Sequence, residues 1–278
     1  MGPRTVVRTL PPAVVARRLA AVAKEFTVPV LPGAEPFLHH GGTTAVLMSH
    51  GFTGSPVSVR AWAEHLAEHG HTVSVPLLPG HGTTWRELNR TTWQQWYAAL
   101  DDELRRLAER ADHVFVAGLS MGGALALRLA EEHGSVIKGL VLVNPAVKVE
   151  DVRLRALPLL MRVVPALGGI RNDIKLTGQD EGAYDRLPLR ALHSQVQGWA
   201  QTVADLGRVD QPLLLFRSRV DHVVPASSSA LVLSRVSSTD VTEVVLEESY
   251  HVATMDNDAP LIFERTVGFL DRIAVTAS

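Results

Sequence analysis

Hydrophobic runs and helical patterns alternate along most of this chain. Short runs rich in Val and Leu, bounded by turn residues, predict strands, whereas apolar residues three and four positions apart predict helices. The predicted strands are TTAVLMS, HTVSVP, HVFVAG, GLVLVN, PLLLFRS and VTEVVLEES, which begin at residues 43, 71, 113, 139, 212 and 241. Helical patterns separate these runs, at 55–70, at 91–111 and directly after Ser120, and another closes the chain at 259–275.

Strands that are apolar at nearly every position are typical of a parallel sheet buried on both faces. Because helices separate them here, the pattern predicts an α/β fold, with a mostly parallel, doubly wound central sheet and helices on both faces. A chain of 278 residues with 46% hydrophobic residues can bury a core of this size.

Residues 146–206 interrupt the alternation. They contain no strand-like run, only an apolar, Pro-interrupted stretch, a polar stretch and the helical pattern PLRALHSQVQGWAQTVADL. Such an insertion either packs on the sheet or covers the strand ends, and its position between two strands favours a small helical cap. We therefore expect a core made of residues 26–145 and 207–278 and a cap of residues 146–206.

Residues 1–25 form an N-terminal extension in this division. The run LPPAVVARRLAAVAKEF is expected to form a short amphipathic helix, since Arg17 and Arg18 split its apolar part and exclude a signal peptide. No apolar segment approaches the roughly 20 residues that span a bilayer, so a cytoplasmic protein without a transmembrane segment is expected. A monomer or a homodimer is expected.

Charge and cysteine content exclude several classes of function. Lys and Arg number 27 against 29 Asp and Glu, which is no electrostatic basis for binding nucleic acid or an acidic membrane surface. The chain has no cysteine, which excludes disulfides, thiol catalysis and zinc-thiolate sites.

Ser120 stands in the sequence GLSMGG, directly between a predicted strand and a predicted helix. A sharp strand-to-helix turn strains the residue at its corner, and flanking glycines relieve the clashes. A serine at this corner is exposed at the edge of the sheet and lies at a helix N-terminus, which favours developing negative charge. Ser120 is the candidate nucleophile; the alternative is a helix-capping serine in a Gly-rich turn.

A serine nucleophile needs a histidine base, which on this kind of sheet follows it in the chain. His133 lies on the helix that leaves Ser120 and His193 lies in the insertion, so neither follows a strand. His251 follows the last predicted strand directly and is the candidate base. His222 is expected only to line a neighbouring loop.

The histidine needs a carboxylate that orients it. Asp221 comes just after the strand PLLLFRS and is the candidate acid, although aspartates in such turns often only cap backbone N–H groups. Asp256 and Asp258 are the rivals, but they lie too close in sequence to His251 to come from a separate strand end.

The oxyanion of an acyl-transfer reaction needs two N–H donors. Met121 directly follows the nucleophile and supplies one candidate. Phe52 supplies the other, because it follows His50-Gly51 where an early strand ends. The alternative for this segment is a plain strand-to-helix turn.

The motifs SHGFTGSP, GLSMGG, SRVDHVVP and SYHVATMD, in this order, resemble the α/β-hydrolase superfamily. More narrowly, the chain is similar to the bacterial carboxylesterase and monoacylglycerol lipase group from about residue 26 to residue 273. The resemblance implies the triad Ser120, Asp221 and His251 and the oxyanion donors Phe52 and Met121.

The insertion resembles the cap of that group. The resemblance implies that Ile170 and Glu181 line a narrow pocket for the glycerol end of a substrate, although the stretch LTGQ between them departs from the group's pattern. For Glu181 the alternative is a solvated loop carboxylate.

These features predict a carboxylic ester hydrolase that works by a Ser-His-Asp acyl-enzyme mechanism and needs no metal or cofactor. The apolar cap residues favour an acyl-chain pocket, hence short to medium acyl esters or monoacylglycerols as substrates and a transient membrane contact through the cap. These apolar cap residues are Leu157, Leu159, Leu160, Met161, Val163 and Val164. A thioesterase, a lysophospholipase and an amidase would use the same triad, and a non-catalytic ligand receptor is the alternative outside enzymes.

Overall fold

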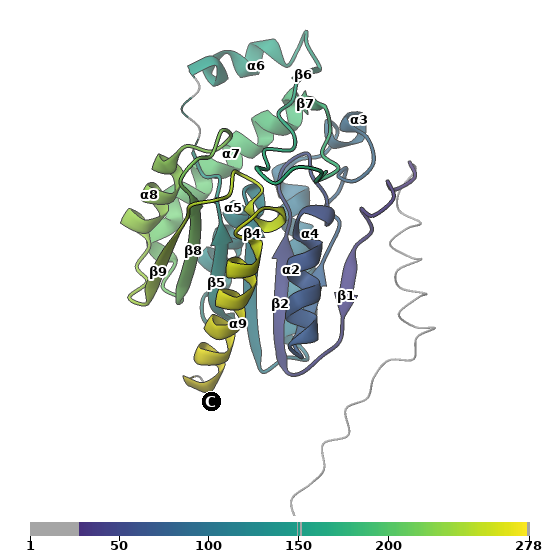
Figure 1. Cartoon of the computed structure of the whole chain (residues 1–278). Coiled ribbons are helices and arrows are strands. Elements are labelled where there is room, and N and C mark those ends of the chain that lie inside the picture. The colour runs from purple at the N-terminus through teal and green to yellow at the C-terminus, as the bar shows by residue number, and fades with distance from the viewer. Residues whose placement is uncertain (1–27, 149, 151, 277–278) are drawn as a thin grey trace, which may run out of the picture.

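The computed structural model describes residues 28–148, 150 and 152–276, and Figure 1 shows a central sheet with helices packed around it. Within these residues, seven strands form the sheet in the order β1-β3-β2-β4-β5-β8-β9. Neighbours in it are parallel except β1, which runs antiparallel to β3. The strands are β1 (Phe37–His39), β2 (Thr44–Ser49), β3 (Thr72–Val75), β4 (His113–Leu119), β5 (Ile137–Val143), β8 (Leu213–Ser218) and β9 (Val241–Leu246).

Helices cover both faces of the sheet, as the alternating sequence pattern predicts. In β2, Val46 and Met48 pack with residues of α2 and α9, whereas Ala45 and Leu47 pack with residues of α4 and α5. This alternation follows from the two-residue period of a strand. The helices are α2 (Val57–Glu68), α3 (Trp85–Leu88), α4 (Trp93–Ala108), α5 (Met121–His133), α6 (Leu157–Leu160), α7 (Leu189–Asp205), α8 (Ala226–Arg235) and α9 (Ala259–Thr276).

The parallel strands bring distant loops to one edge of the sheet. β2, β4, β5 and β8 end at this edge, so the segments that follow them begin side by side. Residues 146–206 leave the sheet after β5 and return before β8. In Figure 1 their elements α6, β6 (Ala166–Gly168) and β7 (Arg186–Pro188) lie above this edge. A cap of residues 146–206 distinct from the core stays a prediction.

The expectation that residues 146–206 hold no strand is wrong, because β6 and β7 pair there antiparallel. Each has three residues, too few to show a two-residue period in sequence. The same shortness hides β1 and the four-residue helix α3. The amphipathic helix expected near the N-terminus lies outside the described residues.

In the described part of the chain, no helix is both long and apolar enough to cross a bilayer.

Candidate active site

Ser120 occupies the strained corner between β4 and α5. Its backbone has φ 56° and ψ −117°, a region that non-glycine residues rarely adopt. A Cβ at Gly118 would lie 2.3 Å from backbone atoms of Gly122, and a Cβ at Gly122 would lie 2.2 Å from the carbonyl oxygen of Ser49. The two glycines therefore permit a close backbone approach that any larger residue would prevent.

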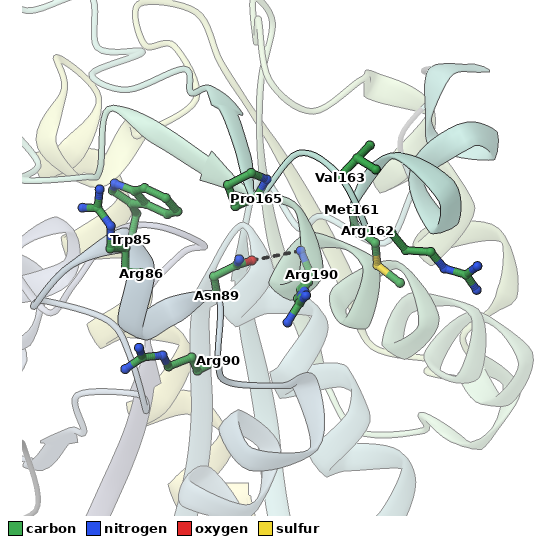
Figure 2. A pocket seen from close by; sticks show the side chains of 9 residues that line it. All are labelled: Trp85, Arg86, Asn89, Arg90, Met161, Arg162, Val163, Pro165 and Arg190. Carbon is green, nitrogen blue, oxygen red and sulfur yellow. Dashed lines mark hydrogen bonds between the residues drawn. The ribbon is translucent and has the colours of Figure 1, made fainter.

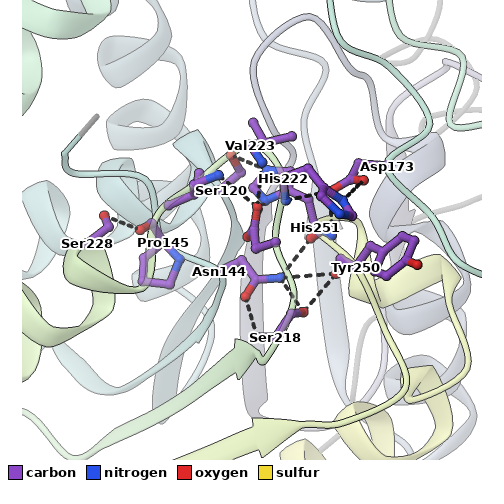
Figure 3. Close-up of polar contacts among 12 residues, drawn as sticks. Ser120, Asn144, Pro145, Asp173, Ser218, His222, Val223, Ser228, Tyr250 and His251 are labelled. Atoms are coloured by element: carbon purple, nitrogen blue, oxygen red, sulfur yellow. Dashed lines mark hydrogen bonds and ion pairs between the residues drawn. The ribbon is translucent and has the colours of Figure 1, made fainter. Parts of the chain in front are cut away.

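Figure 3 shows the polar contacts around Ser120. The Nε2 atom of His251 lies 2.9 Å from Ser120 Oγ, and its Nδ1 atom lies 2.8 Å from Asp221 Oδ2. An ionised carboxylate only accepts hydrogen bonds, so Nδ1 carries the proton and Nε2 is left to accept from the serine hydroxyl. The three side chains are buried and form one continuous hydrogen-bonded chain.

Asp221 is held as an ionised acceptor. Burial alone would raise its pKa, but the charge and hydrogen bond of His251 outweigh burial and hold the pKa below its usual value. The other oxygen, Oδ1, accepts the backbone N–H groups of Val223 at 2.8 Å and Val224 at 2.7 Å. These bonds fix the carboxylate plane and further favour the charged form.

The surroundings of His251 make its imidazole ring more basic. Burial opposes the imidazolium, yet the charge and hydrogen bond of Asp221, followed by the charges of Glu181 and Asp173, raise the pKa of His251 above its ordinary value. A stronger base next to Ser120 Oγ favours proton removal from the hydroxyl.

Asn144 anchors the backbone of residues 247–258, the segment between β9 and α9 that contains His251 and is called the histidine loop below. It sits at the end of β5 with φ 45°, and its side-chain amide donates to the carbonyl oxygen of His251 at 2.8 Å and to Ser218 Oγ at 2.9 Å. Ser218 Oγ donates in turn to the carbonyl oxygen of Tyr250 at 2.8 Å. The sequence pattern does not single out Asn144, although a polar residue at the end of a buried strand was a usable signal.

The neighbouring and rival histidines and aspartates have other hydrogen-bond partners than Ser120. His133 pairs with Asp101, and His222 pairs with Asp173 at 2.7 Å. Asp256 and Asp258 accept backbone N–H groups of the histidine loop, those of Tyr250 and Glu248.

The segment with Phe52 lies against the serine. A Cβ at Gly51 would lie 3.5 Å from Ser120 Cβ. His50 Nδ1 lies 3.0 Å from the Gly51 carbonyl oxygen, and His50 Nε2 accepts the backbone N–H of Leu78 at 3.3 Å. In a trans peptide the C=O and the following N–H point in opposite directions, so His50 also sets the direction of the Phe52 N–H.

His50 is suited to holding the Gly51–Phe52 peptide because its ring stays neutral. Complete burial lowers its pKa to about 4, with a smaller opposing contribution from the Gly51 carbonyl. A neutral ring has one donor and one acceptor nitrogen, which matches its two backbone partners.

The two residues expected to line the glycerol pocket differ in exposure. Glu181 is 9% exposed and Ile170 is 63% exposed. Glu181 Oε1 accepts the backbone N–H of Asn172 at 2.7 Å, and a Cβ at Gly54 would lie 3.9 Å from Glu181 Oε2. Burial raises the pKa of Glu181 above its usual value, only partly offset by the Asn172 N–H and the His251 charge.

Comparison with protein-family models matches residues 42–258 to the Hydrolase_4 family, described as "Serine aminopeptidase, S33". The matched range contains Ser120, Asp221 and His251 and the predicted oxyanion donors. It covers most of the chain.

Individual relatives cover nearly the same range. The chain is 41% identical over 248 residues to the thermostable monoacylglycerol lipase of Bacillus sp. (strain H-257), covering 88% of this chain and 98% of that protein. It is 28% identical over 249 residues to a carboxylesterase of Bacillus subtilis (strain 168), covering 86% and 97%.

A solved structure from work on "LipS and LipT, two metagenome-derived lipolytic enzymes" superposes with a TM-score of 0.85 at 42% identity, covering 87% of this chain and 99% of that one. The superposition confirms the predicted α/β-hydrolase fold.

Proposed function

The chain belongs to this α/β-hydrolase family, as a serine hydrolase similar to bacterial monoacylglycerol lipases and carboxylesterases, and from this premise we propose the reaction that Ser120 carries out. The proposal is hydrolysis of carboxylic esters by two-step acyl transfer, with Ser120, His251 and Asp221 as the catalytic residues. The observation that carries it is the hydrogen-bonded chain from Asp221 through His251 to Ser120 Oγ.

In the first step, His251 Nε2 takes the hydroxyl proton while Ser120 Oγ attacks the ester carbonyl carbon. The resulting oxyanion accepts hydrogen bonds from the backbone N–H groups of Met121 and Phe52. His251 then gives the proton to the alkoxide oxygen. The alcohol leaves, and the acyl group stays bound to Ser120. In the second step water, deprotonated by His251, attacks the acyl carbon; His251 then returns the proton to Ser120 Oγ as the acyl–oxygen bond breaks, and the carboxylic acid is released.

The oxyanion proposal rests on local geometry. Met121 begins α5, so its N–H is one of the helix-terminal donors that need no partner within the helix. Phe52 follows Gly51, which lies against Ser120. His50 fixes the peptide unit that joins Gly51 to Phe52. Preorganised donors of this kind stabilise charge that develops in the transition state.

For the substrate, we propose short to medium acyl esters, including monoacylglycerols. The names of the two relatives, a monoacylglycerol lipase and a carboxylesterase, support an ester over a peptide bond. Glu181 would accept hydrogen bonds from the glycerol hydroxyls. Ile170, the apolar cap residues and the acyl-chain pocket stay predictions.

We expect kcat/KM for p-nitrophenyl esters to rise with acyl length by roughly fourfold per methylene, about 0.8 kcal/mol, until the pocket is full. The measurement is a rate series from acetate to laurate, with monoacylglycerols and a leucine p-nitroanilide in parallel. Faster cleavage of the anilide would favour a peptidase, and a flat ester series would contradict an acyl pocket.

Replacing Glu181 with Gln is the matched test of the alcohol side. It should raise KM for a monoacylglycerol by roughly tenfold and leave KM for p-nitrophenyl butyrate unchanged, since only the first substrate presents hydroxyl groups. Equal effects on both would place Glu181 outside the glycerol contact.

We also propose a transient contact between the insertion and an anionic lipid surface. A cavity of about 450 Å³ lies between α3, the start of α7 and residues 161–165 (Figure 2), and arginines and apolar side chains line it together. The lining residues include Arg86, Arg162 and Arg190 and the 80% exposed Val163. The chain as a whole has no excess of positive charge. At this surface, however, exposed apolar and cationic side chains lie side by side, and such a local cluster suits a lipid surface of opposite charge.

Vesicle sedimentation measures this contact. Binding to vesicles with 30% anionic lipid should exceed binding to neutral vesicles and should weaken about tenfold in the double variant Arg162→Ser, Val163→Ser. Equal binding to both vesicles would contradict a contact through this surface. The cytoplasmic location and the state of monomer or homodimer stay predictions.

A further inference from the structure

Asp173 belongs to the insertion, yet its carboxylate bridges the two loops that carry the proposed acid and base. Its Oδ2 atom accepts the backbone N–H of His222 at 3.1 Å and the backbone N–H of His251 at 3.2 Å. Its Oδ1 atom pairs with His222 Nδ1 at 2.7 Å. His222 directly follows Asp221 in the chain, so one carboxylate oxygen joins the neighbour of the acid to the base itself (Figure 3).

We propose that Asp173 is a positioning residue for ester hydrolysis, a carboxylate supplied by the insertion that keeps the loops of Asp221 and His251 in register. This inference rests on the proposed function of the triad. The active site is then complete only when the segment around Asp173 lies against both loops.

The backbone of His251 is held from both sides. Its N–H donates to Asp173 and its carbonyl oxygen accepts from Asn144. These two bonds fix the position of its Cα atom and therefore restrict where the imidazole can lie. The Asp173 carbonyl oxygen adds a third bond, from the N–H of Val252 at 3.1 Å. Loss of the carboxylate would leave the exposed N–H of His222 and the partly buried N–H of His251 without their acceptor, and the second costs more because water reaches it less easily.

A second carboxylate holds the same segment from the opposite direction. Asp256, in the histidine loop, accepts the backbone N–H groups of Lys175 at 2.6 Å and Leu176 at 2.9 Å, together with that of Tyr250. The chain from Asp173 to Leu176 is thus bound on the histidine loop by its own side chain and by its backbone. This double attachment gives Asp173 a fixed position from which to orient the triad.

The charge of Asp173 also faces the base. Three carboxylates surround His251, those of Asp221, Glu181 and Asp173, and each favours the imidazolium. Positioning and charge can be separated, because Asn offers an amide oxygen to the two backbone N–H groups without a negative charge.

The test compares Asp173→Ala, Asp173→Asn and Asp185→Asn, the last removing an exposed carboxylate of the same insertion. With p-nitrophenyl butyrate, Asp173→Ala should lose roughly 10- to 100-fold in kcat with KM little changed, because misplaced reacting groups slow the chemical step. Asp173→Asn should retain kcat within about threefold, and its acid limb of kcat/KM should move to lower pH, because His251 loses one of the charges that raise its pKa. Asp185→Asn should match the wild type in both.

Two further variants separate the possible failures. His222→Ala removes the side-chain contact with Asp173 but keeps both backbone N–H groups, so it should retain most of kcat. An Asp173→Ala variant with wild-type kcat overturns the inference, as does an Asp173→Asn variant or a His222→Ala variant as impaired as Asp173→Ala. Ser120→Ala serves as the reference: if it retains activity, the proposed function itself fails, whatever Asp173 does. Should Asp173→Ala not fold in thermal unfolding, Asp173→Asn and His222→Ala still decide the question.

Discussion

Replacing Ser120 with alanine should lower kcat for p-nitrophenyl butyrate by at least ~10³-fold. The variant keeps the turn, since the Cβ atom remains, but it removes the oxygen that lies 2.9 Å from His251 Nε2 and would form the acyl-enzyme. Binding and oxyanion contacts would remain and sustain only the residual rate that they provide without a nucleophile. Steady-state kinetics on purified protein measure the loss.

A matched control is Ser234→Ala, which removes an exposed serine hydroxyl on α8 and should leave kcat unchanged. Mass spectrometry after treatment with a fluorophosphonate adds an independent readout, because such reagents form a covalent adduct only with an activated serine. The adduct should map to the peptide with Ser120. Wild-type turnover in Ser120→Ala, or an adduct on another serine only, would refute the assignment.

Replacing Asp221 with asparagine should lower kcat by about 10⁴-fold. Asparagine fills nearly the same space, but its amide can donate to Nδ1. The imidazole is then free to carry its proton on Nε2, where it can no longer accept the proton of Ser120. The bonds from Val223 and Val224 can persist to the amide oxygen, so thermal unfolding should change little.

The pH dependence gives this variant a second, directional signature. The base must be neutral, so activity falls as the pH drops through the pKa of His251, which Asp221 raises most among its neighbouring charges. Without that charge the pKa of His251 falls, and the acid limb of the residual rate should move to lower pH. Asp240→Asn, which alters an exposed pair with Arg272 at the other end of β9, should leave both the rate and the limb in place. An acid limb that moves to higher pH in Asp221→Asn would contradict the assignment of His251 as base and Asp221 as its partner.

Much of the architecture could be predicted because its signals are local. The strand HVFVAG, the glycines around Ser120 and the helical pattern that follows are contiguous, and the structure has β4, the strained turn and α5 at these positions. Asp221 and His251 could be selected because parallel strands end at one edge, which turns order along the chain into proximity in space. The short strands β1, β6 and β7 had no such signal, since three residues cannot display a period.

By itself, the order of residues determined the alternation of strands and helices, the glycine-flanked turn at Ser120 and the choice of its two partners, because each is a matter of local pattern or of strand succession. Only the tertiary structure decided the contacts of Asp173 and Asn144 with the histidine loop and of His50 with the peptide before Phe52. Asp173 lies 78 residues before His251, in a stretch without periodicity, and Asn144 lies 107 residues before it. Such polar partnerships depend on where packing places each loop in three dimensions, and neither hydrophobic period nor residue type records that placement.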